Sequence, residues 1–135
     1  MVPVVDVYRS NQDGSYILIE YVPSKTFGNI GWGNPIMISA EIMGREGLAI
    51  IMKSLRSYKE RAGITNGLGL NPIKMSNRRY KCVGIALRDN LFELQSTKPE
   101  RGGYVGTPEG RFNVNLPLTQ EQLMQYLNRA FEACE

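Results

Sequence analysis

Residues that could catalyse a reaction are sparse in this chain of 135 residues. The sequence contains no histidine, so it lacks the commonest general base near neutral pH and the usual partner of serine and cysteine nucleophiles. Glu100 and Glu109 form a carboxylate pair that could perform acid–base chemistry, but they stand beside Arg101 and Arg111, where solvated salt bridges are the expected role. We therefore expect that the protein is not an enzyme.

Metal and cofactor sites are equally weakly indicated. Cys82 and Cys134 lack the close spacing of zinc ligands, and there is no histidine to join them. Residues 28–34, GNIGWGN, do not end in the Gly-Lys-Ser/Thr of a phosphate-binding loop. The sequence therefore predicts no metal and no cofactor. The sequence favours a buried free thiol at Cys82 over a disulfide, because disulfides form mainly in secreted proteins and the chain shows no secretion signal.

Cations beside aromatic residues are the clearest indication of a binding surface for nucleic acid, since cations take phosphates and rings stack on bases. They form two groups: Arg78, Arg79, Tyr80 and Lys81 in the first, and Lys98, Arg101, Tyr104 and Arg111 in the second. The net charge of +3 is mild, and acidic residues are interspersed. A nucleic-acid-binding module that uses the sheet surface and the basic residues of both groups, with the first group as its main site, is thus the alternative function. The solvated start of a strand is the plainer interpretation of the first group.

Two glycine-rich segments are predicted to be loops that carry contact residues. Residues 23–35 surround Phe27 and the single tryptophan, Trp32, with three glycines and two prolines. Residues 98–110 are long for a connection within a compact domain. Loops carry binding residues more often than their share, although Phe27 and Trp32 could instead fold back to cap the core.

Two amphipathic helices are expected between and after these segments. In residues 39–62, apolar residues recur at steps of three and four, with Ser39 as the N-cap and Gly63 as the stop signal. A second helix begins at Thr119, whose spacing from Gln122 is that of a capping box.

Alternating apolar residues predict strands that these helices would cover. The predicted strands span residues 2–8, 15–22, 80–87, 91–97 and 111–116. With 42% hydrophobic and 21% charged residues, the composition is that of a globular protein. We predict a single α+β domain over residues 1–135, in which a mostly antiparallel sheet of about five or six strands packs against two amphipathic helices.

The N-terminal residues MVPVVDVYRS do not resemble a signal peptide, because no basic segment precedes a long apolar one. No apolar run approaches the length of a membrane span. We therefore expect a cytoplasmic protein that does not interact with membranes.

Residues 78–135 resemble the end of immunity proteins from bacterial contact-dependent growth inhibition systems. Those chains similarly close with a strand, a short Leu/Ile-Pro-like step, a capped segment and an amphipathic helix. That helix ends near an Ala-Leu/Phe-x-x-Cys/Ser pattern, matched here by Ala130, Phe131 and Cys134.

The resemblance implies a small cytoplasmic protein that binds and neutralises a cognate toxin domain, with a nuclease as the expected toxin. Trp, Tyr and Arg dominate interface energetics, so the expected partner-binding residues are Phe27, Trp32, Arg101, Tyr104 and Arg111. Inhibitors of nucleases are often acidic, whereas this chain is net basic. Either the toxin is not strongly basic, or Asp and Glu residues cluster locally in a way that the sequence does not reveal.

Overall fold

The computed structural model describes residues 2–24, 28–61, 79–100 and 103–135. The elements follow the order β1 (Val4–Ser10), β2 (Tyr16–Ser24), β3 (Gly28–Ile38), α1 (Ala40–Arg56), the 3-10 helix η1 (Lys59–Arg61), β4 (Tyr80–Arg88), β5 (Leu91–Glu100), β6 (Gly103–Asn115) and α2 (Gln120–Glu132). The predicted α+β class is confirmed. None of the helices in the described ranges combines the length and apolar character that crossing a membrane requires.

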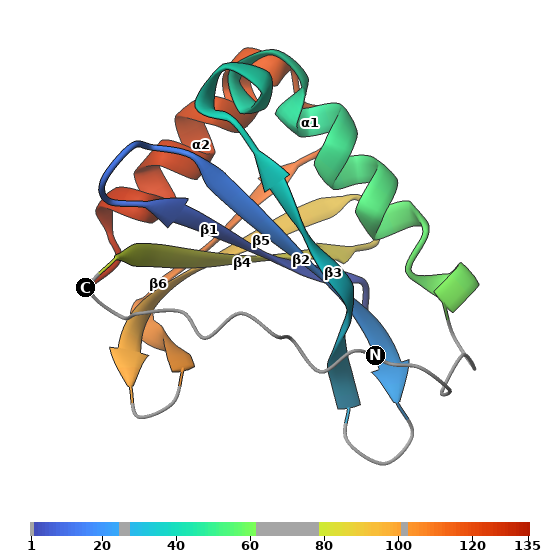
Figure 1. Cartoon of the computed structure of the whole chain (residues 1–135). Coiled ribbons are helices and arrows are strands. Elements are labelled where there is room, and N and C mark those ends of the chain that lie inside the picture. The colour runs from blue at the N-terminus through green and yellow to red at the C-terminus, as the bar shows by residue number, and fades with distance from the viewer. Residues whose placement is uncertain (1, 25–27, 62–78, 101–102) are drawn as a thin grey trace.

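The six strands form one sheet in the order β3-β2-β1-β4-β5-β6. Each neighbouring pair is antiparallel, so the predicted antiparallel sheet is confirmed. Strand β1 lies at the centre, where Val7 faces Leu18 of β2 and Val83 of β4. Both helices lie over the same face of the sheet, as Figure 1 shows.

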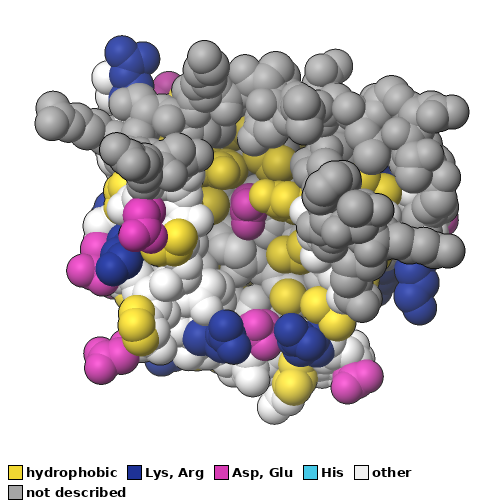
Figure 2. Space-filling model, turned by 90° about the horizontal axis from the view of Figure 1, so that it is seen from below, with side chains coloured by type: hydrophobic (Ala, Val, Ile, Leu, Met, Phe, Trp, Pro, Cys, Tyr) yellow, Lys and Arg dark blue, Asp and Glu magenta, His cyan; other side chains and the backbone are white. Residues whose placement is uncertain are grey.

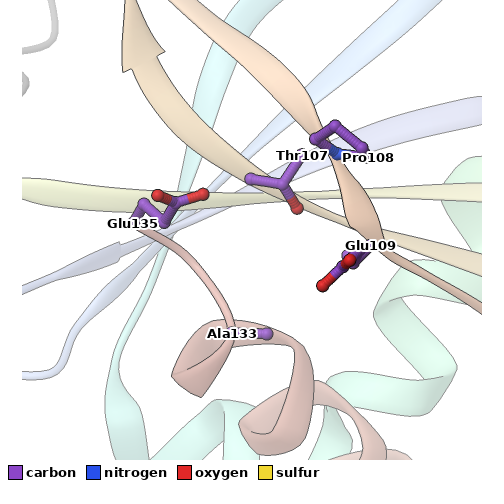
Figure 3. A pocket seen from close by; sticks show the side chains of 6 residues that line it. Thr107, Pro108, Glu109, Ala133 and Glu135 are labelled. Carbon is purple, nitrogen blue, oxygen red and sulfur yellow. The ribbon is translucent and has the colours of Figure 1, made fainter.

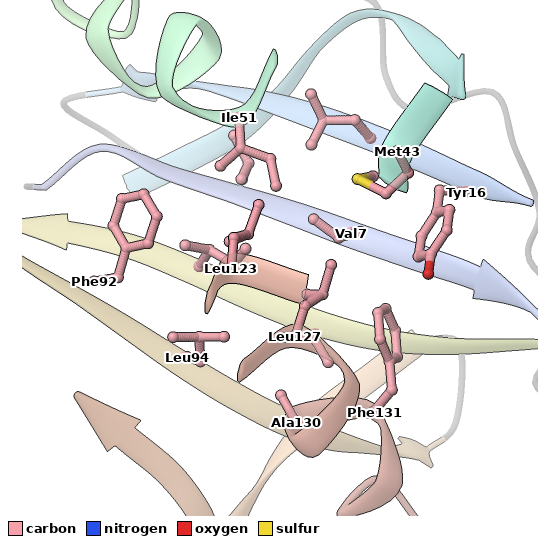
Figure 4. Close-up of a cluster of buried hydrophobic side chains, with 14 of the residues drawn as sticks. Val7, Tyr16, Met43, Ile51, Phe92, Leu94, Leu123, Leu127, Ala130 and Phe131 are labelled. Carbon is pink, nitrogen blue, oxygen red and sulfur yellow. The ribbon is translucent and has the colours of Figure 1, made fainter. Parts of the chain in front are cut away.

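The hydrophobic core fills the space between the sheet and the two helices. Figure 4 shows side chains from both layers that meet there, among them Val7, Met43, Ile51, Phe92, Leu94, Leu123, Leu127 and Phe131. Each of these eight side chains is fully buried. Their burial is the main favourable contribution to folding, at about 1.5–3 kcal/mol for each large side chain.

The predicted helix starts are confirmed. The Ser39 hydroxyl accepts a hydrogen bond from the Ile42 N–H, and Thr119 and Gln122 form the complete capping box. The predicted end of the first helix is wrong, because α1 stops at Arg56 rather than continuing to residue 62. The Ser57 hydroxyl donates to the Lys53 carbonyl, and this local bond competes with continuation of the helix.

Both segments predicted to be loops consist largely of strand. Residues 28–38 form β3, which pairs with β2 from Tyr16↔Ile38 to Ser24↔Gly28. Residues 103–110 belong to β6, which pairs with β5 as far as Glu100↔Gly103. Cross-strand pairing overrides the weak strand propensity of the glycine-rich sequence, since that propensity depends on context.

Candidate partner-binding surface

The face of the sheet opposite the helices, called the open face here, carries a second group of buried side chains. Tyr8, Ile17, Ile19 and Cys82 form its centre, and Tyr21, Tyr80 and Tyr104 pack against them. Successive side chains of a strand point to opposite faces of the sheet. On β1, Val5 and Val7 point to the helices, so Asp6 and Tyr8 point to the open face. Figure 2 views the molecule from this side and shows hydrophobic side chains and an acidic one near the centre of the visible face.

Asp6 lies on the central strand of the open face, between Ile19 of β2 and Gly84 of β4. The Tyr21 hydroxyl donates a hydrogen bond to Asp6 Oδ2. A Cβ atom added at Gly84 would lie 3.4 Å from the other carboxyl oxygen, Oδ1, which is about van der Waals contact distance. Burial raises the pKa of Asp6, although the hydrogen bond from Tyr21 opposes the shift. Among the described residues, Asp6 belongs to none of the ion pairs.

The tyrosine rings contact one another edge to face. The ring centroid of Tyr8 lies 5.5 Å from that of Tyr104 and 6.5 Å from that of Tyr80. The Tyr104 hydroxyl donates to the Tyr80 carbonyl at 3.0 Å. Burial raises the pKa of Tyr104 to about 12 and raises the pKa values of Tyr8 and Tyr21 as well. At neutral pH these phenols stay protonated, so they act as donors and packing surfaces.

The two cysteines are free, and the predicted burial of Cys82 is confirmed. Burial raises the pKa of the Cys82 thiol well above its ordinary value, which keeps it protonated and unreactive. The Thr97 hydroxyl and the Cys134 thiol both donate to the Cys82 carbonyl, at 2.6 and 3.3 Å. Within the ranges that the structure describes, no three His, Cys, Asp or Glu side chains gather as metal ligands do.

A row of charged residues crosses β4, β5 and β6. Glu93 lies between two arginines, with Arg88 Nε 3.1 Å from its Oε2 and Arg111 Nε 3.6 Å from its Oε1. Arg111 also donates to Gln95 Oε1 at 3.0 Å, yet 63% of its side chain is exposed. Figure 2 shows basic and acidic side chains alternating near one margin of the face. The row therefore holds the Arg111 guanidinium in place while leaving it accessible to solvent.

A bulge in β6 forms a cleft with the end of α2. Between the pairs Gln95↔Arg111 and Thr97↔Gly106, β5 has one residue and β6 has residues 107–110. Gln95 Nε2 holds the bulge by donating to the Ser96 and Thr107 carbonyls, at 2.9 and 3.0 Å. The open cleft of about 500 Å³ is lined by Thr107, Pro108, Glu109, Gly110, Ala133 and Glu135.

Two acidic side chains distant in sequence border this cleft. Figure 3 shows Glu109 and Glu135 on either side of Thr107, with Ala133 at the end of α2 below them. The C-terminal end of a helix carries partial negative charge, which adds to that of the two carboxylates. The cleft is therefore a local acidic site on a chain whose net charge is +3.

Two of the residues predicted for partner binding lie on the open face, in different groups. Tyr104 belongs to the tyrosine cluster, and Arg111 belongs to the charged row. Trp32 pairs with Glu20 on the edge strand β3, and its side chain lies outside the described part of the chain. Phe27 and Arg101 also lie outside the described residues.

The residues predicted for nucleic-acid binding do not share one face. Tyr80 packs on the open face, whereas Lys81 pairs with Arg9, whose guanidinium lies 4.4 Å from the Phe131 ring on the helix side. Arg79 is exposed before β4, and Arg78 lies outside the described residues. Alternation along β4 separates the cation from the aromatic ring.

Sequence reasoning missed Asp6, Tyr8, Tyr21, Glu93 and Glu135. The available signal for Asp6 was a lone carboxyl residue inside the β-branched run of residues 2–8. Its tyrosine partner belongs to another strand, and their contact depends on the register Asp6↔Ile19.

Comparison with known proteins identifies the fold alone. No family model matches the chain, and no curated protein matches it. The chain is similar in structure to a protein from Neisseria meningitidis described as "Protein of Unknown Function NMB0488". The TM-score is 0.71, over 100% of this chain and 96% of that one, with 10% sequence identity.

Proposed function

We propose that this protein is an immunity-type inhibitor, which binds a cognate toxin domain in the bacterial cytoplasm and neutralises it, with a nuclease as the expected toxin. The observation that carries the proposal is the open face of the sheet. Neither helix covers it, and it carries the partly buried Tyr21, Tyr80 and Tyr104 as well as the exposed Arg111 guanidinium. Tyrosine and arginine are among the residues that contribute most to binding energy at interfaces.

The chemistry of the open face supports binding rather than catalysis. Burial keeps the thiol of Cys82 and the phenols of Tyr8 and Tyr21 protonated, and none of these groups is an activated nucleophile. An inhibitor needs a stable fold and anchoring side chains. It does not need a reactive group.

The acidic cleft between the β6 bulge and α2 also supports the proposal. A nuclease binds a polyanion and therefore exposes lysine and arginine, to which acidic side chains are complementary. Glu109 and Glu135 supply that complement although the whole chain is net basic. A net basic chain is therefore compatible with inhibition of a nuclease, because the two acidic side chains are concentrated in one cleft.

The first experiment is purification of the tagged protein from its native host at moderate salt. We expect a stoichiometric protein partner, the C-terminal domain of a large secreted protein, identified by mass spectrometry. The absorbance ratio of the same sample measures bound nucleic acid. Nucleic acid without a protein partner, released steeply by added salt and weakened by Arg79→Ala, would overturn the inhibitor proposal in favour of the nucleic-acid-binding alternative.

Titration calorimetry with the purified partner then tests the interface. Arg111→Ala should weaken binding by about tenfold or more, because it removes an exposed arginine of the open face. Arg45→Ala is the matched control, since Arg45 is similarly exposed and forms a surface ion pair with Glu41 on α1, away from the open face. Equal affinities for the two variants would exclude the charged row from the interface.

A further inference from the structure

Two hollows adjoin each other between α1 and the turn that joins β4 to β5. The first has a volume of about 390 Å³ and is lined largely by leucine and methionine side chains. These side chains are Leu48, Met52, Leu87, Leu116 and Leu118. All five pack against the main core but are only partly buried, so apolar surface stays exposed to solvent in this hollow. Its volume lies in the range of ligand-binding clefts, about 300–1,000 Å³.

The second hollow has a volume of about 600 Å³ and a mostly basic border. Arg56, Lys59 and Arg88 line it, together with the acidic Asp89. Arg88 pairs with Glu93, whereas Arg56 and Lys59 belong to none of the ion pairs in the part of the chain that the structure describes. Arg56 and Asp89 border both hollows, which therefore form one continuous groove, called the hairpin groove here.

The dipole of α1 explains part of this charge but not the groove. Arg56 lies in the last turn of α1, where a cation is favourable because that end of a helix carries partial negative charge. The dipole does not require exposed apolar surface beside the cation. An apolar hollow that adjoins exposed cations instead has the composition of a binding site for a ligand that is part apolar and part anionic.

The length of the groove favours an extended peptide as that ligand. Leu48, Met52 and Arg56 follow one another at steps of four residues along α1. At a rise of about 1.5 Å per residue, the apolar and basic ends of this row are about 12 Å apart. An extended chain covers that distance in about four residues at about 3.3 Å each. Side chains a few residues apart in one peptide can therefore occupy both hollows.

We propose that the hairpin groove binds an extended acidic segment of a partner protein. A leucine-like side chain of that segment enters the apolar hollow, and carboxylates about three or four residues away meet Arg56 and Lys59. The proposal does not depend on the inhibitor function, and it uses a surface other than the open face, because α1 lies on the opposite side of the sheet.

NMR titration with short peptides tests the groove. The probes are acetylated and amidated Leu-Ala-Ala-Glu-Glu and, for the other chain direction, Glu-Glu-Ala-Ala-Leu. We expect one of them to cause saturable shifts of the Met52, Lys59 and Leu87 signals. Replacing its leucine with serine, or its glutamates with lysines, should weaken binding by about tenfold or more.

Three results of this titration would overturn the proposal. Shifts that do not saturate with either probe would show that the groove binds no such segment. Equal affinity for the serine peptide would show a general anion site without an apolar contact. Shifts of the same signals when the protein alone is concentrated would assign the groove to a second copy of the chain.

Charge variants locate the bound peptide within the groove. Replacing both Arg56 and Lys59 with glutamine should weaken binding by about tenfold, because each loses an ion pair with a peptide carboxylate. Lys53→Gln is the matched control, since Lys53 is an exposed cation in the last turn of α1 that borders a different hollow. Equal weakening by the control would show that only the overall charge matters. Thermal melting of each variant reports folding.

Asp89→Asn should act in the opposite direction. Its carboxylate lies in the groove, so removal of the charge should strengthen binding of the acidic peptide by about twofold to threefold. Asparagine also tolerates the positive φ of 53° at this position, so the turn is preserved. A purely structural contribution of the groove residues would not produce tighter binding. Unchanged or weaker binding in Asp89→Asn would contradict the placement of the peptide carboxylates.

Discussion

Asp6 shows how burial alters the titration of a single carboxyl group. Burial raises its pKa above the ordinary value of 3.8, so the folded chain holds the carboxyl proton more tightly than the unfolded chain does. As pH rises above 3.8, the unfolded state loses this proton first, and the free energy of unfolding falls until the folded group has also ionised. Tyr8, Tyr21 and Cys82 face Asp6 and stay neutral throughout this range.

We therefore expect Asp6→Asn to be more stable than the parent protein at neutral pH, with a difference that shrinks toward zero below pH 3.8. Urea denaturation across this pH range measures the effect. Asp13→Asn is the control of opposite sign, since hydrogen bonds from Ser15 lower the pKa of Asp13 and its carboxylate is stabilising above that pKa. A stability difference for Asp6→Asn that is the same at every pH would contradict the assignment.

At the scale of elements, the bulge in β6 determines where the acidic cleft forms. Gly110 is packed so closely that a Cβ atom would lie 2.0 Å from Thr107 Oγ1 and 2.8 Å from Ser96 Cβ. Gln95 then bridges the gap between β5 and β6 through two carbonyls. Bulges re-aim side chains in this way and often border functional sites.

Gly110→Ala should destabilise the fold by about 1–3 kcal/mol, because the added methyl group overlaps atoms that the bulge holds in place. Gly44→Ala is the matched control, since Gly44 is exposed in α1 with no atom within 4 Å of an added Cβ. It should stabilise the protein by about 0.5–1 kcal/mol through helix propensity. Chemical denaturation of both variants provides the test, and a Gly110→Ala variant as stable as the parent would show that the bulge relaxes freely.

At the scale of the whole molecule, β1 connects the two halves of the sheet. It pairs with β2 on one side and with β4 on the other, and its residues are buried both toward the helices and on the open face. Strands β3 and β6 form the two edges of the sheet. Opening β1 therefore requires disruption of the core, whereas an edge strand can separate alone.

Amide hydrogen exchange should follow this order. We expect the amides of β1 and β4 to exchange most slowly, through global unfolding, and those of β6 to exchange faster through local opening. NMR-detected exchange in the native state measures both rates. Protection of β6 equal to that of β1 would indicate that the sheet opens as one unit. The prediction applies to the isolated protein, because a partner bound to the open face would add protection.

Local signals made much of the fold predictable from the sequence. The capping residues Ser39 and Thr119, and the apolar period that follows each, located both helix starts, because caps and helical faces involve residues a few positions apart. The alternation of apolar and polar residues, which is also a local signal, located five of the six strands. The sixth, β3, was missed because its glycines carry no alternating side chains and only pairing with β2 makes it a strand.

The candidate site was mostly a product of tertiary structure. Tyr104 and Arg111 were predicted from residue type, but Asp6 meets Tyr21 only because β1 and β2 pair in one register. Glu109 and Glu135 border one cleft only because α2 ends beside the bulge. The sequence by itself determined the residue types, the absence of histidine and the two helix starts, where local hydrogen bonds form. Strand order and the joining of distant side chains were decided by packing across the whole chain, since one-residue shifts in register would turn each of these groups to the opposite face.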